Sequence, residues 1–326
     1  MLVRRPIFLI IVSVWGLIGC QPNNPGSMFD DYLTRVARVQ DAPIVDAEAK
    51  DDFALPRKRE LYIEIPSLSI GLLDSYQLRQ CGLFNLIAER NSVLGKVADE
   101  FHNYDYQRQI LTGLSRCLAH DDIEQTLKLT LADIAQQKRS QLTLHQWNLT
   151  YTSAAMQNQL KGSQWLTGDL GQSVTEVNQA LKQLNSAFTG SDQTVIQAQE
   201  ILDKQPILGR LNYSLVHATW HLDQVTRQLY AHDPQILCEK NRDKTKFNYL
   251  NNVFEQQYVA KVQPYMAQLD GYYQTLSGNL PLFEPKPNIH HYVYPLARHH
   301  REFRQATRRH VEYWQQLFKR CGRKVG

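Results

Sequence analysis

Apolar residues recur at alternating spacings of three and four along most of this chain, and no other feature constrains its fold as strongly. The segment 170–188 shows the pattern most cleanly, since its six large apolar residues fall on one face of a helix. The same period returns in 208–229, 247–276 and 296–321. Several long segments of this kind predict an all-α fold.

The periodic segments also indicate how the helices are arranged. We expect one long helix over about 122–160 that breaks near Gly162, and a bend at Pro264, because proline removes a backbone hydrogen bond. Strand-like alternation is confined to 60–65, and one short strand makes no sheet. We therefore expect a bundle of long amphipathic helices arranged as helical hairpins, with one short extended segment near 60–65 laid along the helices.

The N-terminus resembles that of a bacterial lipoprotein. Two arginines precede an apolar run over 6–19, which is shorter than a helix needs to span a bilayer. The run ends in Leu17, Ile18, Gly19 and Cys20, which resemble a lipobox. The alternative is an ordinary secretory leader that happens to contain a cysteine.

The lipobox resemblance implies a cellular location and a domain organisation. Signal peptide 1–19 would be removed, the Cys20 thiol would receive a diacylglycerol, and residues 20–27 would form a flexible tether before a single helical domain over 28–326. Gln21 after the cysteine implies export to the outer membrane, with the protein anchored by lipid on its periplasmic face.

Four cysteines remain after Cys20, an even number in a compartment where disulfides persist. Sequence leaves three pairings open. We favour Cys81 with Cys117 and Cys238 with Cys321, because each pair would lie at the ends of neighbouring helical segments. A zinc site is the weaker alternative, since no C-x-x-C pair occurs.

Five segments together resemble a family of proteobacterial lipoproteins known only as a domain of unknown function. The resemblance spans nearly the whole mature chain and supplies no activity and no catalytic residue. The segments are LPRKREL, IGLLD, CGLFNLIAERNSVLGKV, LGRLNYSLVHATWHLDQVT and NVFEQQYVAKVQPYMAQL.

Charge and motifs exclude several classes of function. Lys and Arg number 36 against 32 Asp and Glu, an excess too small to predict nucleic-acid binding. The chain contains no phosphate-binding glycine loop and no G-x-S-x-G elbow, so we expect no nucleotide cofactor and no serine hydrolase. His217 and His221 are four apart but lack the glutamate of a metalloprotease, and we predict no metal site.

The densest polar patch lies at 89–96. In a catalytic interpretation Glu89 acts as acid or base, while Arg90 or Lys96 holds an anion. We favour a structural interpretation, in which Asn91 and Gly95 close a helix C-terminus and buried ion pairs link two helices.

Positive charge is concentrated in the last helix, where 298–324 holds nine Lys or Arg against two Glu. All nine avoid the apolar seam, so they could form a binding face for an anionic envelope partner: phospholipid, peptidoglycan or an acidic protein. The alternative is that this face pairs with acidic residues of the chain itself. The residues of the face are Arg298, Arg301, Arg304, Arg308 and Arg309.

These observations favour a non-enzymatic, outer-membrane-anchored lipoprotein that acts as a binding or scaffold component of the envelope. The alternative is an enzyme or carrier acting on a cell-wall or lipid substrate in a cleft near 89–96. No catalytic residue can be assigned in either case.

We predict that the mature protein begins at Cys20 and fractionates with the outer membrane. Cys20→Ser should leave an unprocessed precursor or a soluble protein, because the acceptor of the lipid is gone. Membrane fractionation and mass spectrometry of the N-terminus measure this, and unchanged membrane association of the variant would contradict it.

Overall fold

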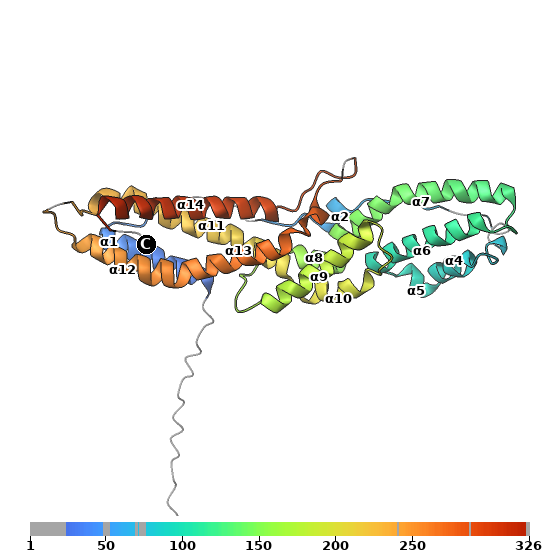
Figure 1. Cartoon of the computed structure of the whole chain (residues 1–326), viewed down its shortest axis with the longest axis horizontal. Helices are drawn as coiled ribbons and strands as arrows, with labels where there is room; N and C mark the ends of the chain where they lie inside the picture. The colour runs from blue at the N-terminus through green and yellow to red at the C-terminus, as the bar shows by residue number, and fades with distance from the viewer. Residues whose placement is uncertain are drawn as a thin grey trace, which may run out of the picture.

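The computed structural model describes residues 24–47, 53–68, 71, 76–239, 241–286 and 288–323. These residues form helices and loops, and the only β-structure in the described ranges is an isolated bridge between Lys286 and His290. The predicted all-α fold is confirmed. The helices pack end to end and side by side into a long rod (Figure 1).

The rod has three parts along its length, with short helical turns between them. One end is a bundle of α1 (Pro25–Gln40), α11 (Ile207–Ala231), α12 (Thr245–Val253), π-helical η2 (Phe254–Val262), α13 (Gln263–Ser277) and α14 (Leu296–Arg320). The middle contains α8 (Ala154–Leu160), α9 (Gly171–Phe188) and α10 (Ile196–Lys204). The other end contains α4 (Leu83–Asn91), α5 (Val93–Lys96), α6 (Glu100–Ala119) and α7 (Gln125–Thr152). The short turns are α2 (Lys58–Leu61), η1 (Asp233–Gln235) and η3 (Leu280–Phe283).

The apolar seams that the sequence predicted form the core. All seven seam positions of α11 are fully buried, and α11 packs against both α1 and α14. A full burial of this kind contributes roughly 1.5–3 kcal/mol for each large apolar side chain. The seam is Leu208, Leu211, Leu215, Ala218, Leu222, Val225 and Leu229.

One buried histidine ties α14 to α1 and α11. The Thr226 hydroxyl donates to the Leu222 carbonyl, so it accepts from Nδ1–H of His310 at 2.9 Å. His310 Nε2 then accepts from Trp314 Nε1–H and from the Tyr32 hydroxyl, each at 3.0 Å. Burial lowers the pKa of His310 to about 3, so the ring is neutral and its hydrogen bonds are fully used.

Two clusters of buried residues fill the rod, and α7 belongs to both. Its first half, with Leu127, Leu131 and Ile134, packs into a small cluster with α4 and α6. Its second half, with Trp147 and Tyr151, packs into the large cluster that runs through the rest of the molecule. Helix α7 therefore links the small cluster at one end of the rod to the large cluster that fills the rest.

The first helix, α1, starts within the segment that was expected to be a flexible tether. α1 begins at Pro25, so the prediction that 25–27 belong to a flexible tether is wrong, and the domain begins a few residues before 28. Asn24 is the N-cap, with its side chain accepting from Gly26 N at 3.0 Å, and Pro25 follows in the first turn, where its missing N–H costs nothing. The predicted signal peptide and Cys20 lie outside the described residues.

Two helical boundaries also differ from the prediction. The long helix is interrupted at Ser153, which was not expected, because Ser153 adopts an extended conformation and its hydroxyl caps the Met156 N–H. Its continuation, α8, ends at Leu160, next to the break expected near Gly162. Over 58–61 the chain forms a helical turn, and only the residues from Tyr62 onward are extended.

Ahead of Pro264 the backbone becomes π-helical within a continuous helix. The π-helical stretch accommodates Pro264, which has no backbone N–H to donate.

The structure contains both disulfides in the favoured pairing. Cys81 is bonded to Cys117 across 36 residues, and Cys238 to Cys321 across 83. The first joins the start of α4 to the end of α6. The second joins the end of α14 to the loop after α11.

None of the helices within the described ranges is both long and apolar enough to cross a membrane.

We expect each disulfide to stabilise the fold by restricting the unfolded chain. In the loop-entropy model, replacing Cys81 and Cys117 by Ala should lower the free energy of unfolding by about 4 kcal/mol, and replacing Cys238 and Cys321 by about 4.5 kcal/mol. Urea titration measures both losses. Peptide mapping without reductant should find no free thiol among the four residues; two free thiols would contradict the pairing.

Candidate ligand-binding site

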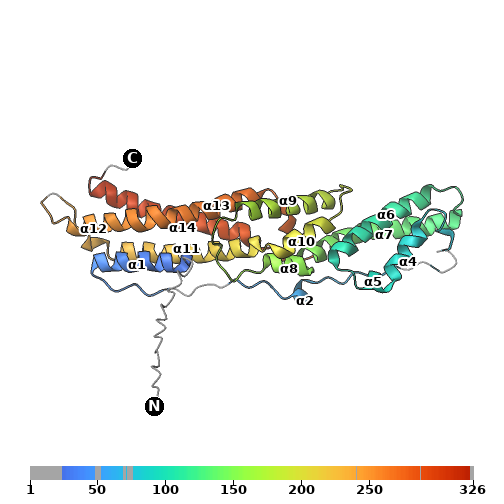
Figure 2. The same cartoon turned by 90° about the horizontal axis from the view of Figure 1, so that it is seen from below.

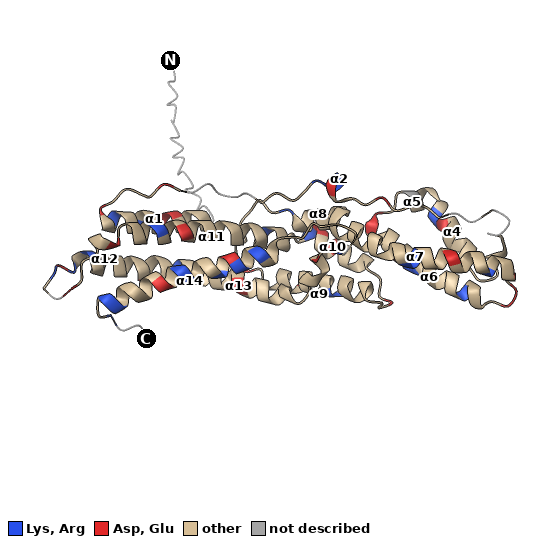
Figure 3. Cartoon of the chain, turned by 90° about the horizontal axis from the view of Figure 1, so that it is seen from above, with Lys and Arg blue, Asp and Glu red and all other residues tan. Residues whose placement is uncertain are grey.

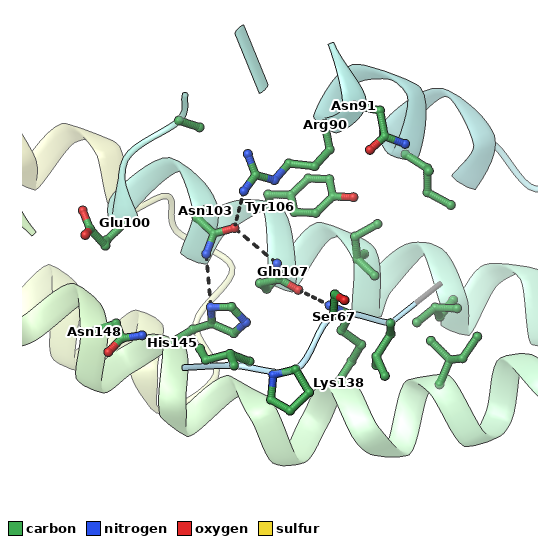
Figure 4. A pocket seen from close by; sticks show the side chains of 18 of the residues that line it. Ser67, Arg90, Asn91, Glu100, Asn103, Tyr106, Gln107, Lys138, His145 and Asn148 are labelled. Atoms are coloured by element: carbon green, nitrogen blue, oxygen red, sulfur yellow. Dashed lines mark hydrogen bonds between the residues drawn. The ribbon is translucent and has the colours of Figure 1, made fainter. Parts of the chain in front are cut away.

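A pocket of about 770 Å³ lies between α4, α6, α7 and the extended residues 62–68. Pockets that hold small molecules in proteins have volumes of about 300–1,000 Å³. Figure 4 shows side chains from α4, α6 and α7 pointing toward this space. It is therefore large enough for a substantial organic ligand.

The extended residues form one wall because α7 holds their backbone. Trp147 Nε1 donates to the Leu61 carbonyl at 2.6 Å. The Asn148 side chain accepts from Ile63 N at 3.0 Å and donates to the Ile63 carbonyl at 2.7 Å, as a neighbouring strand would. Gln141 donates to the Pro66 carbonyl at 2.9 Å. These bonds replace a sheet partner, which explains how an isolated extended segment remains ordered.

The opposite wall, α4, is fixed against α6 at its apolar end. The Cys81–Cys117 disulfide lies there, and Leu83 packs over Gly113 of α6. A Cβ at position 113 would come within 2.7 Å of Leu83 Cδ1, so any larger residue there would require the Leu83 side chain to shift.

The pocket lining changes from apolar to polar along its length. Each of the three helices contributes an apolar residue near the disulfide end and polar residues toward the middle of the rod. Since α6 and α7 run antiparallel, their stripes of three-to-four spacing run in opposite sequence directions and give the same gradient. The stripes are Leu83, Ile87 and Arg90 on α4, Asn103, Gln107, Ile110 and Leu114 on α6, and Ile134, Lys138, His145 and Asn148 on α7.

Two cations and three polar side chains form one hydrogen-bonded network at the polar end (Figure 4). Lys138 Nζ donates to Gln107 Oε1 at 2.8 Å, and Gln107 Nε2 donates to Asn103 Oδ1 at 3.3 Å. Arg90 donates to the same Asn103 oxygen at 3.3 Å. The two cations therefore fix both amide orientations, so Asn103 Nδ2 must donate to His145 Nδ1, which lies 3.1 Å away.

This network carries positive charge that no carboxylate among the described residues balances by an ion pair. Burial, and then the charge of Arg90, lower the pKa of Lys138. Burial and the two cations lower the pKa of His145 to about 4, so its ring is neutral with a proton on Nε2. Neither Arg90 nor Lys138 forms an ion pair with any residue in the described ranges.

Two donors of the network are buried without a partner. These are Arg90 Nη1 and His145 Nε2. A buried donor without an acceptor costs roughly 1–3 kcal/mol, more when it is charged. Acidic side chains at the pocket rim do not satisfy them: Asp99 accepts from Gln199 and from the His102 backbone, and Glu100 pairs with Lys58 at 2.9 Å. An anionic acceptor would satisfy both donors and balance both cations.

The patch predicted at 89–96 contributes in part. Arg90 and Asn91 line the pocket, whereas Glu89 is exposed and does not. The α5 backbone includes Lys96, but the Lys96 side chain lies outside what the structure describes. α4 does end at Asn91, yet the expected ion pairs between helices are wrong for Arg90, which meets the amide of Asn103 and the ring of Tyr106 instead.

Sequence reasoning missed the pocket residues on α6 and α7. The available signal was the polar stripe at 138, 141, 145 and 148, which has helical spacing and continues the apolar stripe of 127, 131 and 134. An apolar seam that becomes polar while it stays buried predicts a polar cavity or a ligand.

The basic face expected on α14 is largely neutralised by the chain itself. Arg298 pairs with Glu302, Arg304 with Asp270 at 3.0 Å, and Arg309 with Asp223 at 2.8 Å. Arg301 and Arg308 are exposed and have no ion pair in the described ranges. Figure 3 shows the basic residues along this helix.

The two histidines of α11 lie among aromatic rings. His217 stacks on Tyr213 with ring centroids 3.7 Å apart, and His221 stacks on Phe29 at 5.4 Å. Across the described ranges, no cluster of three or more His, Cys, Asp or Glu side chains could hold a metal ion.

We predict that removing one of the pocket cations stabilises the empty protein. Lys138→Gln keeps a donor for Gln107 and removes an unbalanced, half-buried charge, so the free energy of unfolding at pH 7 should rise by roughly 0.5–2 kcal/mol. The pKa of Lys138 is lower in the folded protein than in the unfolded chain, so the folded state loses the proton first as pH rises. Once the folded Lys138 is neutral it no longer costs stability, and the gain from Lys138→Gln should therefore shrink as pH rises through the folded-state pKa.

Arg139→Gln is the matched control, because Arg139 is the exposed neighbour on the same helix. It should change stability by less than about 0.5 kcal/mol. Urea titrations from pH 7 to 10 measure both variants. Equal effects of the two substitutions on the free energy of unfolding at pH 7 would contradict the claim that the charge of Lys138 costs stability.

Comparisons with known proteins identify the family of the chain. No curated protein and no solved structure matches it. The model of a family described as protein of unknown function (DUF3080) matches residues 29–325, which include every pocket residue named above. The chain therefore belongs to the DUF3080 family.

Proposed function

We propose that this protein is a non-enzymatic envelope lipoprotein that binds an anionic amphiphile in the pocket between α4, α6 and α7. The ligand chemistry is a single acyl chain with a negatively charged head group. The head would lie between Arg90 and Lys138, and the chain would extend toward Leu83, Leu114 and Ile134.

One observation carries this proposal: the same pocket combines two unbalanced, half-buried cations at one end with an apolar lining at the other. A charged head group accepting from Arg90 and His145 would supply the missing acceptors. Charge-assisted hydrogen bonds of this kind are worth about 1.5–3 kcal/mol each. The apolar end excludes water and favours a hydrocarbon chain.

Other occupants and roles have less support. A cell-wall fragment carries anionic groups but is polar along its whole length, so it would leave the apolar end unfilled. An enzyme would need an acid or base at the polar end. Glu89 lies outside the lining, and His145 already accepts from Asn103. The lining carboxylates Asp99 and Glu100 are bound to Gln199 and Lys58. An anionic partner on α14 would have to compete with three internal ion pairs.

The place of action that we propose is the periplasmic face of the outer membrane. Support comes from the lipobox-like residues ending in Cys20, from Gln21 after them, and from two disulfides, which persist in an oxidising compartment. Lipids with anionic heads surround a protein anchored there.

Titration of the purified protein with a fluorescent long-chain carboxylic acid tests the proposal. Arg90→Gln and Lys138→Gln should each weaken binding about 10- to 100-fold, since the loss of one charge-assisted bond corresponds to that factor. Arg139→Gln should leave affinity unchanged. The alcohol and the primary amine of the same chain length should bind at least tenfold more weakly than the acid.

Binding should also weaken as pH rises above neutral, because Lys138 loses its proton earlier than a free lysine does. Lys138→Arg should restore binding at high pH, since arginine keeps its charge. Equal affinity for acid, alcohol and amine, or unchanged binding in both cation variants, would exclude the proposed role of the polar end.

A further inference from the structure

We propose that the side of the rod carrying α1, α2 and α5 lies against the lipid bilayer and that the pocket loads from that bilayer. This inference rests on the proposed ligand chemistry and adds the source of the ligand. Figures 2 and 3 show α1, α2 and α5 along one long side of the rod.

Apolar side chains project from this side beside the pocket. Val93 and Val97 of the α5 turn are 82% and 76% exposed, and Tyr62 is 53% exposed while it also lines the pocket. Val97 directly precedes Ala98 and Asp99, which are lining residues too. Single exposed apolar residues are ordinary, but here one lines the pocket and two lie within five residues of the lining residue Ala98, so the surface beside the pocket favours an apolar environment.

The length of chain before α1 selects a bilayer as the occupant of this surface. α1 starts directly after Asn24, which is the fourth residue after Cys20. Fully extended, four residues span about 14 Å. With a diacylglycerol on Cys20, the start of α1 is therefore held within about 14 Å of the lipid head groups.

Two ion pairs on this side lower the cost of approaching lipid. Arg57 pairs with Glu60, and Lys58 pairs with Glu100 at 2.9 Å. The contact should then depend mainly on the apolar rim and the anchor, and less on anionic lipid. Insertion of Val93, Val97 and Tyr62 would bring acyl chains to the pocket without passage through water.

Depth measurement on the full lipidated protein tests the contact. A bilayer-sensitive fluorophore on a single cysteine at Val97→Cys should be quenched by spin-labelled lipid in phosphatidylethanolamine–phosphatidylglycerol vesicles. The matched position is Leu129→Cys, because Leu129 is 66% exposed on α7. Figure 1 shows α7 and α5 on opposite sides of this end of the rod. Equal quenching at positions 97 and 129 would overturn the inference.

Transfer kinetics separate this inference from the proposed function. In the double variant Val93→Gln and Val97→Gln, uptake of a fluorescent fatty acid from vesicles should be at least fivefold slower, while its affinity for monomeric fatty acid in dilute solution stays unchanged. Normal solution binding with unchanged uptake would overturn the membrane contact and leave the ligand proposal intact. No solution binding by the parent protein would overturn the ligand proposal itself.

Discussion

The structure depends on how α7 is buried. Its first half needs apolar partners and finds them in α4 and α6, whereas further along it buries Gln141, His145, Gln146 and Asn148. Buried polar groups must be satisfied. Some of them hold the backbone of the extended residues 62–68, which have no strand partner, and His145 joins the α6 network. The pocket lies where these two requirements meet.

The contrast between the two basic regions follows from the same rule. On α14 the arginines lie near solvent and three of the five candidate residues have carboxylates in reach, so charge is balanced locally. In the pocket, Arg90 and Lys138 donate to the side-chain amides of Asn103 and Gln107, which are neutral and cannot balance their charge. Retaining two like charges without a counter-ion costs stability. Such a cost is common where a site is built for a ligand.

Much of the fold could be predicted because seams such as that of α11 follow a single period, and period alone determines which face is buried. The disulfide pairing followed from the ends of those helices. Capping residues signal both the break at Ser153 and the start at Pro25. The break was missed because the apolar pattern continues across it, and the start was missed because Pro25, Gly26 and Ser27 are typical of a flexible tether. The network between Arg90, Asn103, Lys138 and His145 could not be predicted, since it joins three helices whose relative rotation no local pattern specifies.

The central claim is that the pocket has a charged end and a hydrocarbon end with a fixed direction. A crystal structure of the protein with a bound long-chain fatty acid tests it most directly. We expect the carboxylate of the fatty acid to lie between Arg90 and Lys138, with its hydrocarbon chain running past Ile110 toward Leu114. A carboxylate at the Leu114 end, or a ligand bound elsewhere while this pocket stays empty, would contradict it.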